Sequence, residues 1–140
     1  MSITPLYTTT ATATGGRSGK VTSADGIIDM TLAMPKELGG PGNAANPETF
    51  FASGYAACFQ GALGLVARGK GVTLPAGNTV TVTIGIGKDE TSFGLNAAIV
   101  VHLPGLDQAT ADALAHAAHQ VCPYSKATRG NIDATVKATV

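Results

Sequence analysis

The chain has 140 residues, a formal net charge of zero and only 13% charged residues. This length fits one domain, residues 1–140, and is enough to bury most of the surface that the unfolded chain would expose. Lys and Arg form no run, and aromatic residues make up 5% of the chain. The composition therefore excludes the basic, aromatic-rich surface of a nucleic-acid binder, and we expect no nucleic-acid partner.

The start of the chain, MSITPLYTTTATATGG, has neither a basic segment nor an apolar core. This pattern argues against a secretory signal peptide. No apolar stretch is long and uninterrupted enough, by inspection, to be expected to span a bilayer. The sequence therefore predicts a cytoplasmic protein with no membrane partner.

The first third of the chain has the composition of β-strands. Residues 6–14, LYTTTATAT, are rich in threonine, which favours an extended backbone, and Gly15–Gly16 predict a turn or bulge after them. Residues 19–35 hold two strand-like arms around Asp25–Gly26, which tolerate positive φ, so we expect a hairpin there. The next segment, KELGGPGNAANPE, has the composition of a loop.

A buried helix is predicted from Glu48 to about Lys70. Asn46 can cap it, and Pro47 suits its first position. Apolar residues recur at spacings of three and four on one face, and the opposite face is also apolar, so the helix should be buried on nearly all sides, against its own sheet or a second subunit. The first face holds Phe51, Tyr55, Cys58, Ala62 and Val66, and the second holds Ala52, Ala56, Phe59 and Leu63. Three glycines within it, Gly54, Gly61 and Gly64, indicate close helix packing.

Two strands are predicted at 79–87 and 92–103, and a last strand with one buried face at 131–140. Between them, a helix after Pro104 should stop near Cys122, because Pro123 disfavours helical geometry in the residue before it. The order is three strands, helix, two strands, helix, strand. It predicts an α+β domain with two helices packed on antiparallel sheet.

The two cysteines lie in unlike settings, Cys58 inside the apolar helix and Cys122 at the end of the second helix. A reactive cysteine often has a resolving cysteine beside it, although free cysteines are also commonly buried and inert. Burial raises a thiol pKa, so a reactive Cys58 needs a compensating positive charge. Arg17 in GGRSG is the best candidate, because the glycines around it let the backbone approach another element.

Glu48 is a natural anchor for Arg17, since a carboxylate can hold a guanidinium by two parallel hydrogen bonds. It could equally stabilise the helix dipole without any catalytic role. Ten helical residues, about 15 Å, separate Glu48 from Cys58, so Glu48 cannot easily serve the Cys58 of its own chain. We therefore expect a dimer in which Glu48 and Arg17 of one subunit reach Cys58 of the other.

The histidines leave two other interpretations open. His116, His119 and Cys122 lie three apart on one helical face, and Cys58 could add a fourth metal ligand. The chain lacks the CxxC pair and the HExxH motif of common zinc sites, so we expect no metal. His119 could also act as base to Cys58 in a cysteine hydrolase, but no nucleophile motif of that class accompanies it.

Three stretches, GGRSG, NPETFFASGYAACF and AHQVCPYSKATRGNID, together resemble the organic hydroperoxide resistance branch of the Ohr/OsmC family. The resemblance runs from the first strand to the last. It implies an OsmC-like α+β fold with antiparallel sheets wrapped around two central helices in an intertwined homodimer. It also implies a thiol-dependent peroxidase that reduces alkyl and fatty-acid hydroperoxides to alcohols, needs no metal or haem, and is recycled by a dithiol, typically a lipoyl group on a protein.

Carried over to this chain, Cys58 resembles the peroxidatic cysteine and Cys122 the resolving one. Arg17 and Glu48 resemble the pair that activates the thiolate, and Arg17 would also stabilise the charge on the leaving alkoxide. Cys58 would become a sulfenic acid, Cys122 would condense with it, and the dithiol would reopen the disulfide. The alternatives are an OsmC-type peroxidase with a different substrate range and reductant, or a non-enzymatic cysteine redox sensor.

Aromatic residues near Cys58 agree with a hydrocarbon substrate, if they line a pocket rather than fill the core. They are Phe50, Phe51, Tyr55 and Phe59. The chain departs from the family pattern at Lys126, where asparagine is usual, and at Ala44–Ala45, where glycine and threonine are usual. Arg129 and Asn131 fit the pattern, and we treat them as structural.

Overall fold

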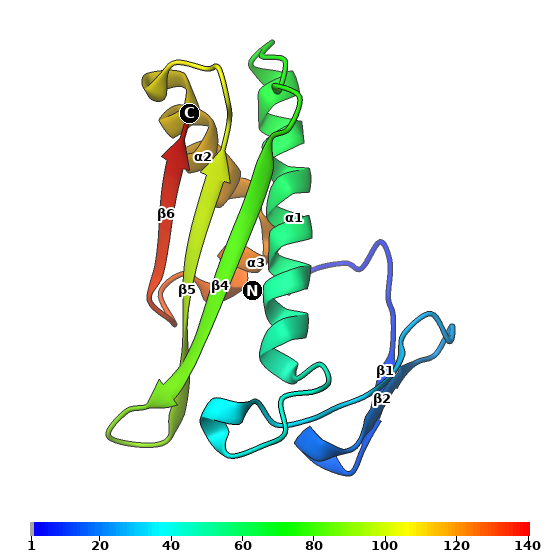
Figure 1. Cartoon of the computed structure of the whole chain (residues 1–140). Coiled ribbons are helices and arrows are strands. Elements are labelled where there is room, and N and C mark those ends of the chain that lie inside the picture. Colours follow the sequence, from blue (N-terminus) through cyan, green and yellow to red (C-terminus); the bar gives the residue numbers. More distant parts are fainter. Residues whose placement is uncertain (1) are drawn as a thin grey trace. The chain divides into compact units, whose positions relative to one another are not determined.

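The protein is described by a computed structural model that covers residues 2–140. The chain forms two compact units, one ending at Pro47 and the other running from Glu48 to Val140, and each is described by itself (Figure 1). That the whole chain is one domain stays a prediction. The mixed α+β class expected from the order of elements is confirmed.

The first unit is built on a three-stranded antiparallel sheet. Its strands are β1 (Ala11–Thr14), β2 (Lys20–Ser23) and β3 (Asp29–Thr31), in that order across the sheet. The predicted hairpin is present, since β2 and β3 pair antiparallel. Gly26, in the turn between them, has a φ of 76°. Two short 3₁₀ helices, η1 (Gly16–Ser18) and η2 (Lys36–Leu38), interrupt the loops.

The second unit has a sheet with one buried face. Its strands are β4 (Thr79–Lys88), β5 (Phe93–His102) and β6 (Ala134–Thr139), with β5 in the centre. Along β5 the side chains of Ala97, Ile99 and Val101 are buried and those between them are exposed. This alternation shows that the core covers only one face of the sheet.

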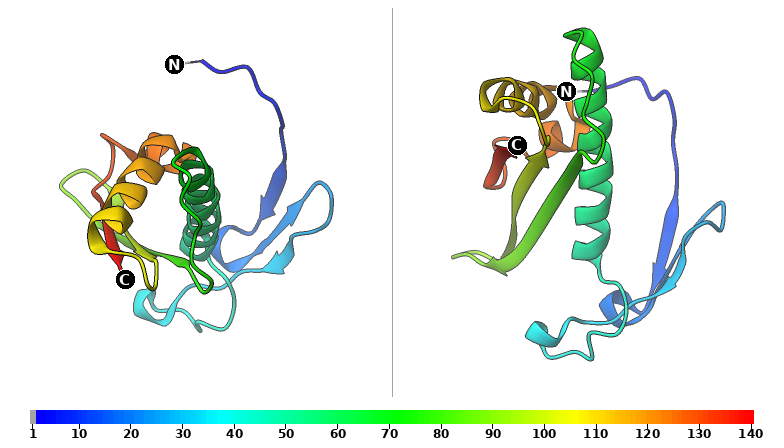
Figure 2. Two further views of the ribbon diagram at one scale, coloured as in Figure 1. Left: turned by 90° about the horizontal axis from the view of Figure 1, so that it is seen from above. Right: turned by 45° about the horizontal axis from the view of Figure 1, so that its top comes forward.

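Helices form the other layer of the second unit: α1 (Pro47–Gly69), α2 (Gln108–Val121) and α3 (Pro123–Thr128). The predicted helix boundaries are confirmed, since Pro47 is the first residue of α1 and Cys122 ends α2 just before Pro123. In the end-on view of Figure 2, the orange α3 lies between α2 and α1. The sequence did not predict α3, because six residues are too few to show helical periodicity.

The expectation of purely antiparallel sheet was wrong for one pair of strands. β4 and β5 are antiparallel, but β5 and β6 are parallel over six residue pairs from Ala97–Ala134 to His102–Thr139. The chain between them contains α2 and α3, which form a helical crossover, the kind of connection that a parallel pair needs. This crossover carries Cys122 across the buried face of the sheet.

Helix α1 is less buried than predicted. Tyr55, Phe59 and Leu63 are fully buried, but Leu65 is 58% exposed and no atom lies within 4 Å of a Cβ built at Gly61. By length and composition α1 could also cross a membrane, with a mean hydropathy of 1.4, so the expectation that no apolar stretch is long enough was wrong. Alanine, phenylalanine, leucine and valine raise the hydropathy of this helix, and one of its faces packs in the protein core.

The core of the second unit should depend strongly on α2. Leu114 has no exposed surface and lies in the same cluster as Ile99 and Phe59. We expect Leu114→Ala to lower the free energy of unfolding by about 2–5 kcal/mol, because it removes buried methyl groups and leaves a cavity. Urea denaturation measures this loss, and Leu38→Ala, at a 44% exposed position, is the control that should change stability little.

Candidate functional site

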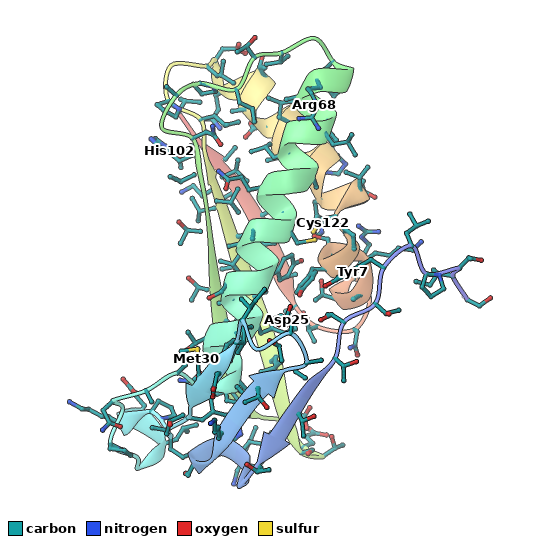
Figure 3. All side chains as sticks on the ribbon, turned by 90° about the vertical axis from the view of Figure 1, so that its right-hand side faces the viewer. Tyr7, Asp25, Met30, Arg68, His102 and Cys122 are labelled. Atoms are coloured by element: carbon teal, nitrogen blue, oxygen red, sulfur yellow. The ribbon has the colours of Figure 1, made fainter. Side chains whose placement is uncertain are left out.

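The two cysteines, 64 positions apart in sequence, face each other across the helical layer. Both are free thiols, and the Sγ of Cys122 lies 3.8 Å from the Sγ of Cys58. Cys122 is fully buried and points toward α1, whereas Cys58 is partly exposed (Figure 3). A disulfide requires the sulfurs to approach to about 2.05 Å. The arrangement therefore places two reduced thiols in contact, with the outer one open to a reagent.

The surroundings of Cys58 disfavour the thiolate form of its side chain. Burial is the main cause that raises the pKa of Cys58, and the neighbouring Cys122 thiol raises it further. The backbone N–H of Tyr124, in the first turn of α3, donates to the Cys58 sulfur and opposes this rise. The direction agrees with the expectation from the sequence: a reactive Cys58 needs a further source of positive potential.

Three aromatic rings of α1 and α3 pack together near the start of α3. Tyr124 packs against Phe51 and Tyr55, with ring centroids 6.2 and 5.7 Å away, respectively. Gly54 makes this packing possible, since a Cβ there would lie 2.9 Å from the Tyr124 hydroxyl. The predicted close packing at a glycine of α1 is thus confirmed at Gly54 and involves α3.

An apolar cavity of about 420 Å³ lies beside these rings. It is lined by Phe51, Leu95, Pro123, Tyr124, Ala127, Thr128, Asn131 and Ile132. Of the four aromatic residues considered for a substrate pocket, Phe51 is in this lining, Phe50 is half-buried, and Tyr55 and Phe59 are fully buried in the core. The sequence did not single out Tyr124, although its position next to the CP dipeptide is a local signal for it.

A buried set of polar side chains flanks the cysteines and was also missed. The Tyr55 hydroxyl lies 2.9 Å from the Ser125 Oγ and 3.1 Å from the Thr128 Oγ1. The Ser125 Oγ is in turn 2.8 Å from the His119 Nδ1. These four residues, here called the hydroxyl network, join α1 to α2 and α3. Of the four, the sequence indicates only His119, because serine and threonine after a cysteine carry no distinctive sequence signal.

The pKa of His119 is lowered, first by burial and then by the positive charges of Arg129 and His116. The unfolded chain therefore binds a proton at His119 at a higher pH than the folded chain does. We expect the free energy of unfolding to fall as pH is lowered from about 6.5 toward 5, and His119→Gln to flatten this part of the profile. Urea denaturation at several pH values measures it, and an identical slope in His119→Gln would contradict the assignment.

Arg17 lies in the first unit, in a turn shaped by glycines. Gly15 and Gly16 have φ values of 75° and 62°, and a Cβ on Gly19 would collide with the Thr14 carbonyl oxygen. The turn therefore folds back on itself at η1, a conformation that glycines allow and other residues do not. Arg17 lies at the tip of this turn and is half-buried. The predicted turn at Gly15–Gly16 is confirmed, whereas the approach of this turn to another element and the role of Arg17 stay predictions.

Glu48 is the second residue of α1 and is half-buried in its first turn. Because α1 is unbroken from Pro47 to Gly69, Glu48 and Cys58 are separated by about 15 Å of helix. The structure thus holds the two residues apart within one chain, as the spacing predicted.

The proposed metal ligands have other surroundings. Within residues 2–140, no group of three or more His, Cys, Asp and Glu residues is placed to hold a metal ion. The Nδ1 of His119 is engaged by Ser125, and Arg129 donates to the His119 carbonyl oxygen at 2.6 Å, which agrees with a structural role for Arg129. The absence of a metal cofactor stays a prediction.

Comparison with known proteins identifies the family of the chain. Residues 40–137 match the family model described as OsmC-like protein. The chain is 48% identical to the organic hydroperoxide resistance protein of Xanthomonas axonopodis pv. citri, covering 94% of this chain and 93% of the relative. It is 44% identical to organic hydroperoxide resistance protein OhrA of Bacillus subtilis, covering 95% and 96%.

Solved structures agree in fold as well as sequence. An organic hydroperoxide resistance protein from Legionella pneumophila matches with a TM-score of 0.92 and 46% identity, over 98% of this chain and 100% of that one. One from Vibrio cholerae, solved with captopril in one of its active sites, matches with a TM-score of 0.91 and 45% identity, over 99% and 95%. The chain therefore belongs to the OsmC family, in its organic hydroperoxide resistance branch.

Proposed function

We propose that the protein is a thiol-dependent peroxidase that reduces organic hydroperoxides to alcohols and so provides resistance to them. The observation that carries the proposal is the contact of two reduced thiols, Cys58 and Cys122, at 3.8 Å, with the partly exposed thiol in front and the buried one behind it. A sensor or structural pair needs no such order of access. Relatives named organic hydroperoxide resistance proteins supply the substrate class.

The first step uses Cys58 as the peroxidatic cysteine. Its thiolate attacks one oxygen of the O–O bond, which breaks and gives a Cys58 sulfenic acid and an alkoxide that leaves as the alcohol after taking a proton. The Tyr124 N–H is placed to stabilise the thiolate, and we assign to Arg17, oriented by Glu48, the larger stabilisation of the thiolate and of the leaving alkoxide. The apolar cavity lined by Phe51 and Tyr124 suits an alkyl or fatty-acyl tail.

The second step uses Cys122 as the resolving cysteine. Its thiol attacks the sulfenic sulfur, an S–S bond forms, and the hydroxyl group leaves as water with the thiol proton. A dithiol reductant then reduces the disulfide by exchange, and a lipoyl group on a partner protein fits this role. The cysteines of the protein and this external dithiol complete the cycle in the cytoplasm, with no metal or haem.

Steady-state kinetics test this function. Purified protein with cumene hydroperoxide and dihydrolipoamide should consume both compounds with many turnovers per chain. Stoichiometric oxidation of the cysteines without turnover would favour the redox sensor. A clear preference for hydrogen peroxide over organic hydroperoxides would instead favour the OsmC-type alternative.

A homodimer completes the site in this proposal. The exposed side of α1 combines small and apolar residues at helical spacing, including Ala57, Gly61 and Leu65, and leaves room for a second helix at Gly61. Glu48 is held about 15 Å from Cys58 along the same helix. We infer an intertwined dimer in which Arg17 and Glu48 of one subunit act on the partner's Cys58.

Mixing two inactive variants tests this arrangement. If Arg17 acts across the dimer, Cys58→Ser and Arg17→Ala subunits should complement each other, because a mixed dimer has one site with both native residues. Co-refolding equal amounts should restore about a quarter of the wild-type activity, since about half of the dimers are mixed and each has one complete site. No recovery in dimers proven to be mixed would place Arg17 and Cys58 of one site in the same subunit.

A further inference from the structure

The hydroxyl network lies near the cysteine pair, and the proposed peroxidase steps do not use it. Tyr55 and Ser125 have no exposed surface, and Thr128 is 5% exposed. Buried polar groups destabilise a fold unless each is hydrogen-bonded. In residues 2–140 no buried side-chain nitrogen or oxygen lacks a partner. Apolar side chains would pack a small core equally well. The presence of a complete buried network therefore needs a reason other than packing.

The protons in this network can be assigned by counting, because each hydroxyl has one hydrogen. Thr128 Oγ1 donates to the Ser125 carbonyl oxygen at 3.2 Å, so it accepts from the Tyr55 hydroxyl. The Tyr55 hydrogen is then used, so Ser125 Oγ donates to Tyr55 and accepts from His119 Nδ1–H. The network has one direction, from His119 to the backbone of α3. Protonation of His119 at Nε2 keeps it intact, because Nδ1 remains a donor.

The network joins the three helices at the level of the two sulfurs. Tyr55 precedes Cys58 by three residues on α1, and His119 precedes Cys122 by three residues on α2. Ser125 follows Cys122 by three residues, on the far side of the break between α2 and α3. Cys122 has extended backbone angles at this break, φ −66° and ψ 123°, and its backbone hydrogen bonds go to the flanking helices, to Ala118 on one side and from Lys126 on the other. The network links both flanking helices, α2 and α3, to α1.

We propose that Tyr55, Ser125 and His119 are positioning residues that hold Cys122 against Cys58 for disulfide closure. The proposal rests on the proposed function, since closure follows formation of the Cys58 sulfenic acid. In that step the Cys58 S–O bond breaks and an S–S bond forms, the sulfenic sulfur is reduced and the Cys122 sulfur is oxidised, and water leaves. Sulfurs already 3.8 Å apart need only a short approach, so closure precedes attack by a second peroxide molecule.

The decisive measurement separates the two chemical steps in Tyr55→Phe and Ser125→Ala. Tyr55→Phe keeps the ring that packs on Phe51 and Tyr124 and removes only the hydroxyl. Stopped-flow oxidation with cumene hydroperoxide should show Cys58 oxidised at the wild-type rate and closure slowed about fivefold or more, since each variant loses two hydrogen bonds of the network and one alone corresponds to about fivefold. Mass spectrometry should show a matching rise in Cys58 sulfinic acid. Ser92→Ala, in the exposed β4–β5 turn, is the matched control.

The double variant and an equilibrium measurement complete the test. Tyr55→Phe and Ser125→Ala together should slow closure by less than the product of the two single effects, because both variants remove the same Tyr55–Ser125 hydrogen bond. Wild-type closure in both single variants, or an equal slowing of both steps, would overturn the proposal. If wild-type Cys58 does not react with the hydroperoxide, the proposed function fails, but titration of the Cys58–Cys122 disulfide against glutathione still tests the positioning. There both variants should lower the effective concentration of the two thiols about fivefold, and unchanged values would overturn it.

Discussion

Cys58→Ser is expected to abolish peroxide reduction, whereas Cys122→Ser should retain a single turnover and then inactivate. Serine in place of Cys58 has no thiolate to attack the O–O bond, so the rate should fall by at least about 10³-fold. Without Cys122 the sulfenic acid still forms, but no thiol lies 3.8 Å away to trap it. Excess hydroperoxide then converts it to sulfinic and sulfonic acids, which the dithiol does not reduce.

Mass spectrometry and steady-state kinetics on the same samples distinguish these outcomes. Cys122→Ser treated with one equivalent of cumene hydroperoxide should release one equivalent of alcohol and gain one oxygen. Cys58→Ser should gain none, and it serves as the control for reaction at Cys122, which is fully buried. Equal and mild losses in both variants would mean that the cysteines are structural. Full multiple turnover in Cys122→Ser would mean that the reductant acts directly on the sulfenic acid.

Local signals predicted most of the fold. The start of α1 at Pro47 and the end of α2 at Cys122 both depend on the fixed geometry of proline, which acts on adjacent residues. The turn at Gly26 likewise depends on a conformation that one residue type favours. Such features are properties of a few consecutive residues and can be inferred without knowing the rest of the chain.

The errors concern contacts between distant residues. The parallel pairing of β6 with β5 depends on where the α2–α3 crossover returns the chain, and the alternation of apolar residues in β6 is the same for either direction. The prediction that both faces of α1 are buried is confirmed for Tyr55 and Phe59, but the expected burial on nearly all sides is wrong at Leu65, which is 58% exposed. Gly61 suggested close packing that a single chain does not contain.

The candidate site divides in the same way. The residue types needed for thiol chemistry could be chosen from the sequence, because a thiol needs a partner and a cation whatever the fold. The contact between Cys58 and Cys122 joins residues on different helices, and the Tyr55–Ser125 hydrogen bond spans 70 positions. No short motif encodes such a pairing. The hydroxyl network therefore became visible only when α3 was placed against α1.

The second large effect is expected for Arg17. Burial raises the pKa of Cys58, and the Tyr124 N–H opposes this only in part, so at neutral pH the thiol form would dominate without a cation. A guanidinium at about 4 Å, with an effective dielectric near 20, contributes roughly 4 kcal/mol, or on the order of three pKa units before desolvation is subtracted. Arg17→Ala should therefore slow Cys58 oxidation about 10²- to 10³-fold at pH 7.

The pH profile shows whether Arg17 acts through the thiolate. Loss of Arg17 raises the pKa of Cys58, so the rate of Arg17→Ala should climb steeply with pH and approach the wild-type rate in alkaline solution, whereas the wild-type rate changes little above neutral pH. Arg17→Lys should recover part of the rate through its charge, and Glu48→Gln should lose part, because a single charge lacks the orientation of a paired guanidinium. Arg68→Ala, at the exposed far end of α1 (Figure 3), is the matched control. A uniformly slow Arg17→Ala with the wild-type pH profile would show that Arg17 binds the peroxide without activating the thiol.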